Sequence, residues 1–206
     1  MKINEFWKSW KNKTCFEKEA ILFVEKAIES VIKSVPKNQL VAIYIKGSFA
    51  RREMKKDSDV DMVPIVTENK YEGPVWGTNV PEIHPVVVVP LSLWELKHNK
   101  LCSASSYHPD LRAKPDRLLS GLGECKLVYG KQLKASQFSI RSDAQALTDE
   151  IKIIKKGYIP AYHEGAITFS PLLKEVFWLV ELDQKVKGKK VKHSFEDITK
   201  SVKDNN

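Results

Sequence analysis

Two short apolar runs separated by a polar connection restrict the fold of this chain more than any other feature. The runs are LVAIYI at residues 40–45 and VDMVPIV at residues 60–66, and both are rich in β-branched residues, which favour strands. The connection, residues 47–61, begins with Gly-Ser and ends with Asp-Val-Asp. The sequence therefore predicts two strands whose connection carries a glycine-serine turn and a pair of carboxylates.

The two carboxylates belong to Asp59 and Asp61, which stand two residues apart at the start of the second run. Side chains alternate between the faces of a strand, so both should point to one face with Cα atoms roughly 6 to 7 Å apart. Magnesium prefers oxygen ligands and is typically held by one or two carboxylates together with substrate phosphates. Asp59 and Asp61 are therefore predicted metal ligands, in a site that could hold two Mg²⁺ ions.

The start of the connection has the residues needed to hold a phosphate. Gly47 allows the backbone to approach an anion, Ser48 adds a hydroxyl, and helix-forming residues with free N-terminal amides follow. Arg51, Arg52 and Lys56 are the basic residues predicted to contact a triphosphate. The alternative for this basic run is a solvated surface without a ligand.

A calcium-binding loop is a competing interpretation of the same segment. Asp57, Asp59 and Asp61 occupy positions 1, 3 and 5 of such a loop, and Glu68 falls at position 12. Met62, however, stands where the sharp turn of that loop requires glycine, and a β-rich run follows in place of a helix. The sequence thus disfavours an EF-hand.

The spacing GS-x10-DxD resembles the signature of the DNA polymerase β-like nucleotidyltransferase superfamily, and most of all its small members with a minimal catalytic domain. The resemblance extends over roughly residues 40–130. It implies an α+β fold in which a mixed β-sheet is flanked by helices. It also implies a nucleoside triphosphate donor, two Mg²⁺ ions, and transfer of a nucleoside monophosphate with release of pyrophosphate.

In that superfamily a third carboxylate on a later strand completes the metal site and activates the acceptor hydroxyl. Glu82 is the best match, because it opens the apolar run EIHPVVVV at residues 82–89, which is predicted to be a third strand. His84 would share its face and is the fallback ligand. Pro81 precedes the run, so Glu82 departs from a pattern in which the third acid stands inside the strand.

The remaining patterns predict helices around the strands and an all-α region at the end of the chain. Thr14 with Glu17 predicts a capping box, Ser92 with Glu95 is expected to cap a short helix, and Ser142 is expected to cap a third helix. Gly157 is expected to end the helix that Ser142 begins. We expect a nucleotidyltransferase domain at residues 1–138 and a C-terminal helical domain at residues 139–206.

Composition favours anionic partners and a reducing compartment. The formal net charge is +8, and the three cysteines lie outside any CxxC pattern. The charged N-terminus lacks the apolar core of a signal peptide, and no apolar run is long enough for a membrane span. We therefore expect a cytoplasmic protein, with a homodimer as one possible use of the apolar helix near residues 171–186.

The sequence thus favours a Mg²⁺-dependent enzyme that transfers a nucleoside monophosphate, AMP from ATP in the first place, to a hydroxyl. The acceptor could be a small molecule, a protein side chain or an RNA end. The alternative is a non-catalytic or antitoxin-type regulatory protein that binds nucleotide and acts on a partner protein.

Overall fold

The computed structural model describes residues 3–102, 111–190 and 195–203. The chain divides into two compact units, residues 1–107 with 113–140, and residues 108–112 with 141–206. Each unit has its own elements, and each is described by itself.

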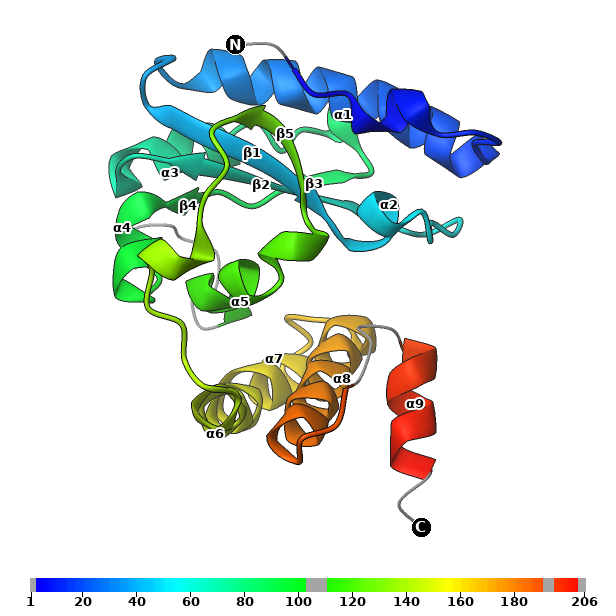
Figure 1. Ribbon diagram of the computed structural model, residues 1–206, viewed down its shortest axis with the longest axis vertical. Coiled ribbons are helices and arrows are strands. Elements are labelled where there is room, and N and C mark those ends of the chain that lie inside the picture. The colour runs from blue at the N-terminus through cyan, green and yellow to red at the C-terminus, as the bar shows by residue number, and fades with distance from the viewer. Residues whose placement is uncertain (1–2, 103–110, 191–194, 204–206) are drawn as a thin grey trace. The chain divides into compact units, whose positions relative to one another are not determined.

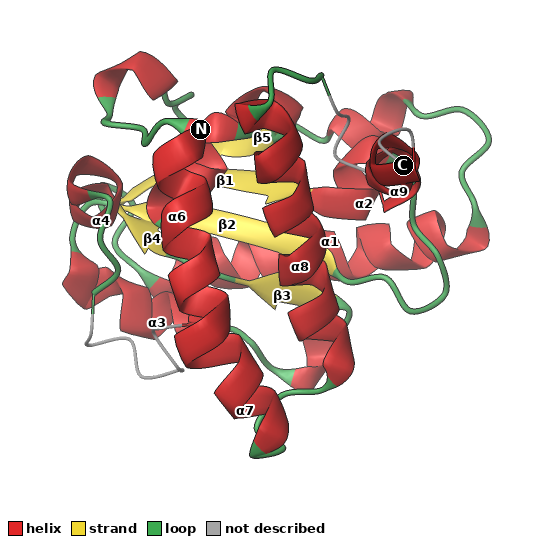
Figure 2. Cartoon of the chain, turned by 90° about the horizontal axis from the view of Figure 1, so that it is seen from below, coloured by secondary structure: helices red, strands yellow, loops and turns green. Residues whose placement is uncertain are grey.

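The first unit is a mixed sheet with helices on both faces (Figure 1). The strands run in the order β3-β2-β1-β5, and β4 pairs with the far end of β2 (Figure 2). β1 is antiparallel to β2 and to β5, whereas β2 is parallel to β3 and β4. The described strands are β1 (Leu40–Lys46), β2 (Val60–Val66), β3 (Val86–Val88), β4 (Leu91–Ser92) and β5 (Lys126–Gly130). The helices are α1 (Cys15–Ser34), α2 (Gly47–Arg51), α3 (Glu72–Trp76), α4 (Leu93–His98) and α5 (Pro115–Ser120).

Helix α1 covers one face of the sheet. Thr14 caps it with the predicted capping box, in which the Glu17 amide donates to Thr14 Oγ1 at 3.1 Å and the Thr14 amide donates to Glu17 Oε2 at 2.8 Å. Its apolar stripe, repeating at helical spacing, packs on the sheet residues of the same face. The fully buried residues of this core include Val24, Ile28, Val31, Ile43, Ile45, Met62 and Val128. One face of α1 is thus buried against the sheet, as is usual for an amphipathic helix.

The opposite face packs on α4 and α5. Tyr44 and Val63 are cross-strand neighbours on this face, and both are buried beside Leu96 and Leu119. The Tyr44 hydroxyl accepts a hydrogen bond from the amide of Leu133 at 2.7 Å, which satisfies the polar end of a buried ring. Tyr44 and Val63 are the last residues of this face that are buried under α4 and α5. The next residues along the same face belong to the candidate site.

Pro64 lies in a central strand, although a proline in a strand is usually confined to an edge, a bulge or a strand end. β2 has β1 on one side, where Pro64 pairs with Ile43, and the two short strands β3 and β4 on the other. The parallel pairing stops at Met62 and resumes at Ile65, so Pro64 stands level with the break between β3 and β4. The missing N–H of proline therefore costs no ladder hydrogen bond.

The second unit is helical where it is described. Its elements are α6 (Asp143–Ile153), a π-helical segment (Ile154–Tyr158), α7 (Ile159–His163), α8 (Phe169–Val186) and α9 (Phe195–Lys203). The predicted cap at Ser142 is confirmed, and it is a capping box in which the Gln145 amide donates to Ser142 Oγ at 3.3 Å. The helix does not end at Gly157 but continues through the π-helical segment into α7. Pro160 lacks a donor for the regular helical hydrogen bond, and a widened turn just before it is consistent with that defect.

No helix among the described residues combines the length and the apolar character that crossing a membrane would require.

Candidate active site

The glycine-serine turn and the aspartate pair meet at one edge of the sheet. β1 ends at Lys46, which lies opposite Asp61 near the start of β2. Asp61 in turn lies level with Val87 of the parallel strand β3. Because directly opposed residues share a face, Lys46, Asp61 and Val87 belong to the face that carries Tyr44 and Val63, beyond the last buried side chains. This end of the sheet is thus partly open to solvent.

The contact between Gly47 and Asp61 fixes the geometry of this edge. Gly47 begins α2 with φ of 76°, a left-handed conformation that favours glycine. A Cβ atom added at Gly47 would lie 2.5 Å from Asp61 Oδ2, so the space that a side chain would need is filled by the carboxylate. The turn that the sequence predicts to hold phosphate therefore begins directly beside a predicted metal ligand.

The donor set at this edge suits a hard cation. Asp61 lies in β2 and Asp59 directly before it, and both are partly exposed carboxylates. Within residues 3–102, 111–190 and 195–203, no cluster of three or more His, Cys, Asp or Glu side chains is positioned to hold a metal. Two carboxylates that leave positions for water and substrate phosphates fit Mg²⁺, which seldom takes an all-protein ligand set.

Glu82 lies outside the strand to which the sequence assigned it. The predicted strand at residues 82–89 is shorter in the structure, and β3 begins only at Val86. Glu82 is in the 3-10 turn Pro81–Ile83, and its side chain is exposed, as is that of His84. The strand position level with Asp61 is occupied by Val87, which cannot bind a metal. β3 therefore supplies no third carboxylate at the level of the aspartate pair.

The basic residues of the connection differ in their surroundings. Arg51 pairs with Glu53 through Nε at 2.8 Å, in an ion pair open to solvent on both sides. Lys56 is exposed in the turn before β2. Arg52 forms an ion pair with the buried Glu17, through Nε at 3.0 Å. Arg51 and Lys56 remain available for an anion, because exposed ion pairs are weak.

Two residues beside the site were not predicted from the sequence to belong to it. Lys46 faces Asp61 across the strand pair, and Cys125 precedes β5 on the other side of Lys46. Burial raises the pKa of the Cys125 thiol, and the nearby charges of Lys46 and Asp61 act on it in opposite directions. The strand register that joins these residues is a long-range feature, and the only local signal was the position of Lys46 just before the glycine-serine turn.

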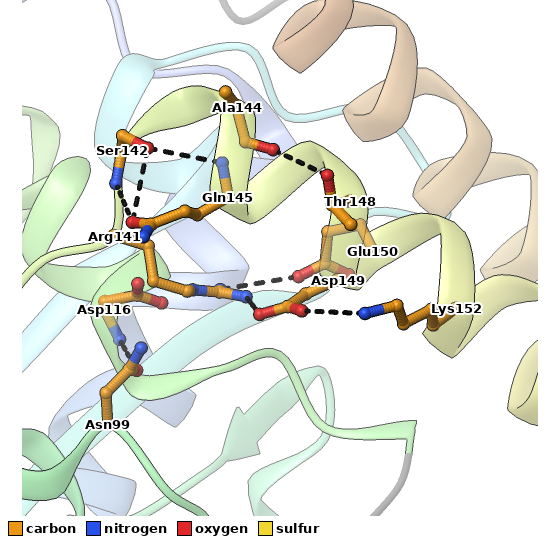
Figure 3. A network of polar contacts seen from close by, with 10 residues as sticks. All are labelled: Asn99, Asp116, Arg141, Ser142, Ala144, Gln145, Thr148, Asp149, Glu150 and Lys152. Carbon is orange, nitrogen blue, oxygen red and sulfur yellow. Dashed lines mark hydrogen bonds and ion pairs between the residues drawn. The ribbon is translucent and has the colours of Figure 1, made fainter.

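The second unit contains a polar network at the start of α6 (Figure 3). Arg141 bonds to Asp149 at 2.9 Å and lies 3.7 Å from the buried carboxylate of Glu150. These contacts offset the cost of burying Glu150 and connect the residue before the N-cap of α6 to the second half of the helix. The same arginine lines an open hollow with Gln145 and Thr148.

Comparisons with known proteins support the fold. No family model matches the chain, and no curated protein matches it. Among solved structures, spectinomycin adenyltransferase AAD(9) from Enterococcus faecialis, solved with ATP and spectinomycin, is similar with a TM-score of 0.51 and 14% sequence identity. The match covers 85% of this chain and 78% of the adenyltransferase. The chain has a nucleotidyltransferase fold.

The α+β fold with a mixed sheet is thus confirmed, and it agrees with the resemblance that the GS-x10-DxD spacing suggested. A second solved structure, a toxin-antitoxin with AMP-PNP, matches with a TM-score of 0.33 and 16% identity. That match covers 69% of this chain and 93% of the other, but a TM-score this low does not establish a common fold. At these identities the likeness concerns the fold, and the chemistry has to be argued from the residues.

Proposed function

We propose that this protein is a Mg²⁺-dependent nucleotidyltransferase that transfers AMP from ATP to a hydroxyl of an acceptor and releases pyrophosphate. The observation that carries the proposal is the packing of the Asp61 carboxylate against Gly47. It brings the residues suited to a phosphate beside the residues suited to a metal. A nucleoside triphosphate with bound Mg²⁺ requires both kinds of group in one place.

Asp59 and Asp61 would hold the metal. When bound, Mg²⁺ neutralises phosphate charge and polarises the oxygens that attack and leave. The two aspartates would hold the metal with the triphosphate at the sheet edge, and the absence of a side chain at Gly47 would let the backbone of the turn approach the phosphates. Ser48 offers a hydroxyl donor, and Arg51 and Lys56 offer positive charge from the same connection.

The donor and the acceptor are proposed from chemistry and from the solved adenyltransferase. That protein was solved with ATP, which supports ATP as the donor to test first. It was also solved with spectinomycin, so a small hydroxyl-bearing molecule is the first acceptor class to test. A protein side chain and an RNA end are the other two classes. We further propose that residues 1–138 act as the catalytic domain and residues 139–206 as a helical domain.

The proposal is tested by following the label from ATP labelled in its α-phosphate, with Mg²⁺ and a cell extract as the source of acceptors. We expect the wild-type protein to transfer label to one fraction, small molecules, protein or RNA, and we expect Asp59→Asn and Asp61→Asn to abolish this transfer. Asp57→Asn is the matched control, because Asp57 is an exposed acid two residues before the pair.

Calorimetric titration with MgATP separates the enzyme from its alternatives. Binding with transfer supports the enzyme, whereas binding without transfer to any fraction would favour the regulatory alternative. Absence of both binding and transfer in the wild-type protein would overturn the proposal.

A further inference from the structure

Arg52 is held in place by a buried carboxylate from another element. It follows α2 in the left-handed conformation, with φ of 62°. Its Nε donates to Glu17 Oε1 at 3.0 Å, and its Nη2 donates to Glu17 Oε2 at 3.2 Å and to the carbonyl oxygen of Asn12 at 3.3 Å. The guanidinium also lies 5.0 Å from the ring centre of Trp10. These contacts occupy the fork of the guanidinium that would otherwise bind a phosphate.

The partner of Arg52 is itself fixed. The Glu17 side chain is 2% exposed, and its Oε2 also accepts the amide of Thr14 in the capping box of α1. A buried carboxylate with these partners cannot move without losing several hydrogen bonds at once. In Figure 1 the N-terminal end of α1 lies beside α2, in agreement with this contact.

An aromatic cluster joins the same two regions. Phe49, in the middle of α2, is fully buried. Its ring lies between 5.1 and 6.2 Å from the rings of Phe6, Trp7 and Trp10, which belong to the segment before α1. The segment before α1 therefore contacts this region twice. Its aromatic rings pack on Phe49 of α2, and the carbonyl oxygen of Asn12 accepts from Arg52, which follows α2.

Helix α2 depends on these contacts for its position. It has five residues, and helices this short are not stable by themselves in water. Its start is fixed against Asp61, and its end is fixed by Arg52. Any loosening at Arg52 would shift the backbone of the glycine-serine turn relative to the aspartate pair.

We infer that Glu17 and Arg52 form a positioning pair that sets the glycine-serine turn for nucleotide binding, and that Arg52 is not itself a phosphate ligand. This inference rests on the proposed function and deepens it. It assigns a role to Glu17, a residue of α1 that lies outside the GS-x10-DxD motif. It also separates Arg52 from its neighbour Arg51, whose pairing with Glu53 is exposed.

The test is a double-mutant cycle read by two measurements. The variants are Glu17→Gln, Arg52→Met and the double variant, and Lys33→Met is the control, because Lys33 pairs with Glu29 on the exposed surface of the same helix. Calorimetry gives the Kd for MgATP, and thermal unfolding gives the Tm. We expect each single variant to raise Kd by about tenfold or more and the double variant to add little, since both break one interaction.

The outcomes separate three roles of Arg52. A direct phosphate ligand would lose affinity in Arg52→Met while Glu17→Gln binds normally, and a merely structural pair would lower Tm with Kd unchanged in both. Either result would overturn the inference. Arg52→Lys keeps the charge but loses the fork, so it provides a folded variant in which an intermediate Kd is expected even if Arg52→Met does not fold.

A transfer assay at varied ATP concentration adds a second readout. We expect the ATP concentration for half-maximal transfer to rise in Glu17→Gln, and an unchanged value would contradict the positioning role. Failure of the wild-type protein both to bind MgATP and to transfer label would overturn the proposed function and this inference together. Binding by the wild type that Glu17→Gln leaves unchanged would overturn only the inference.

Discussion

Replacing Gly47 by alanine tests the contact on which the candidate site depends. An alanine at this position would keep φ near 76°, in the left-handed region, which costs an L-residue about 1–2 kcal/mol. For a protein of this size, that cost lowers Tm by about 2–8 °C. The added Cβ would also lie 2.5 Å from Asp61 Oδ2, which is far inside normal contact.

The close contact between the added Cβ and Asp61 should reduce activity more than stability. The atom in the way is the end of an aspartate side chain, which can rotate aside without moving the backbone. Stability should therefore fall by little more than the backbone cost. The carboxylate, however, would leave its position beside the turn, and misplacing a reacting group by 1 Å costs on the order of 100-fold in rate.

The assay compares Gly47→Ala with Gly188→Ala. Gly188 has the same φ of 76°, but no heavy atom lies within 4 Å of its added Cβ, so this control carries the backbone cost alone. We expect both variants to lose similar stability by thermal unfolding. Label transfer from ATP should fall by about 100-fold in Gly47→Ala only. Equal transfer by the two variants would refute the role assigned to the Gly47–Asp61 contact.

Two further predictions concern Glu82 and Glu17. Glu82→Gln should leave label transfer near the wild-type rate, because Glu82 is exposed outside β3; a loss as large as that of Asp61→Asn would contradict this. The hydrogen bond from Arg52 is the main cause that holds the pKa of Glu17 below its ordinary value of 4.5, against the opposing effect of burial. The stabilisation by ionised Glu17 is therefore fully present above pH 4.5 and is lost as the pH falls through the lowered pKa. The difference in unfolding free energy between wild type and Glu17→Gln should be smaller at pH 3 than at pH 7, and a difference independent of pH would be inconsistent with the ion pair.

Local features of the chain could be predicted from the sequence because neighbouring residues determine them. The helix caps at Thr14, Ser92 and Ser142 are confirmed, since each needs only a hydroxyl residue just before a helix-forming segment. The two strands and the turn between them follow from apolar runs and a glycine. The resemblance carried by GS-x10-DxD is supported at the level of the fold.

Features that depend on contacts between residues distant in sequence could not be predicted. Nothing near Arg52 indicates that its guanidinium pairs with Glu17, 35 residues earlier. The central position of Pro64 follows from the gap between β3 and β4, and Lys46 and Cys125 join the site only through the register of β1 with its neighbours. The short length of β3 removes Glu82 from the level of the aspartates.

The sequence by itself thus determined the element types around the motif and the residues that could bind a metal and a phosphate. The tertiary structure decided which of those residues share one sheet edge and which are engaged elsewhere. The physical reason is that backbone conformation and side-chain alternation are set over a few residues. Strand register and buried ion pairs, in contrast, are set by packing between segments far apart in the chain.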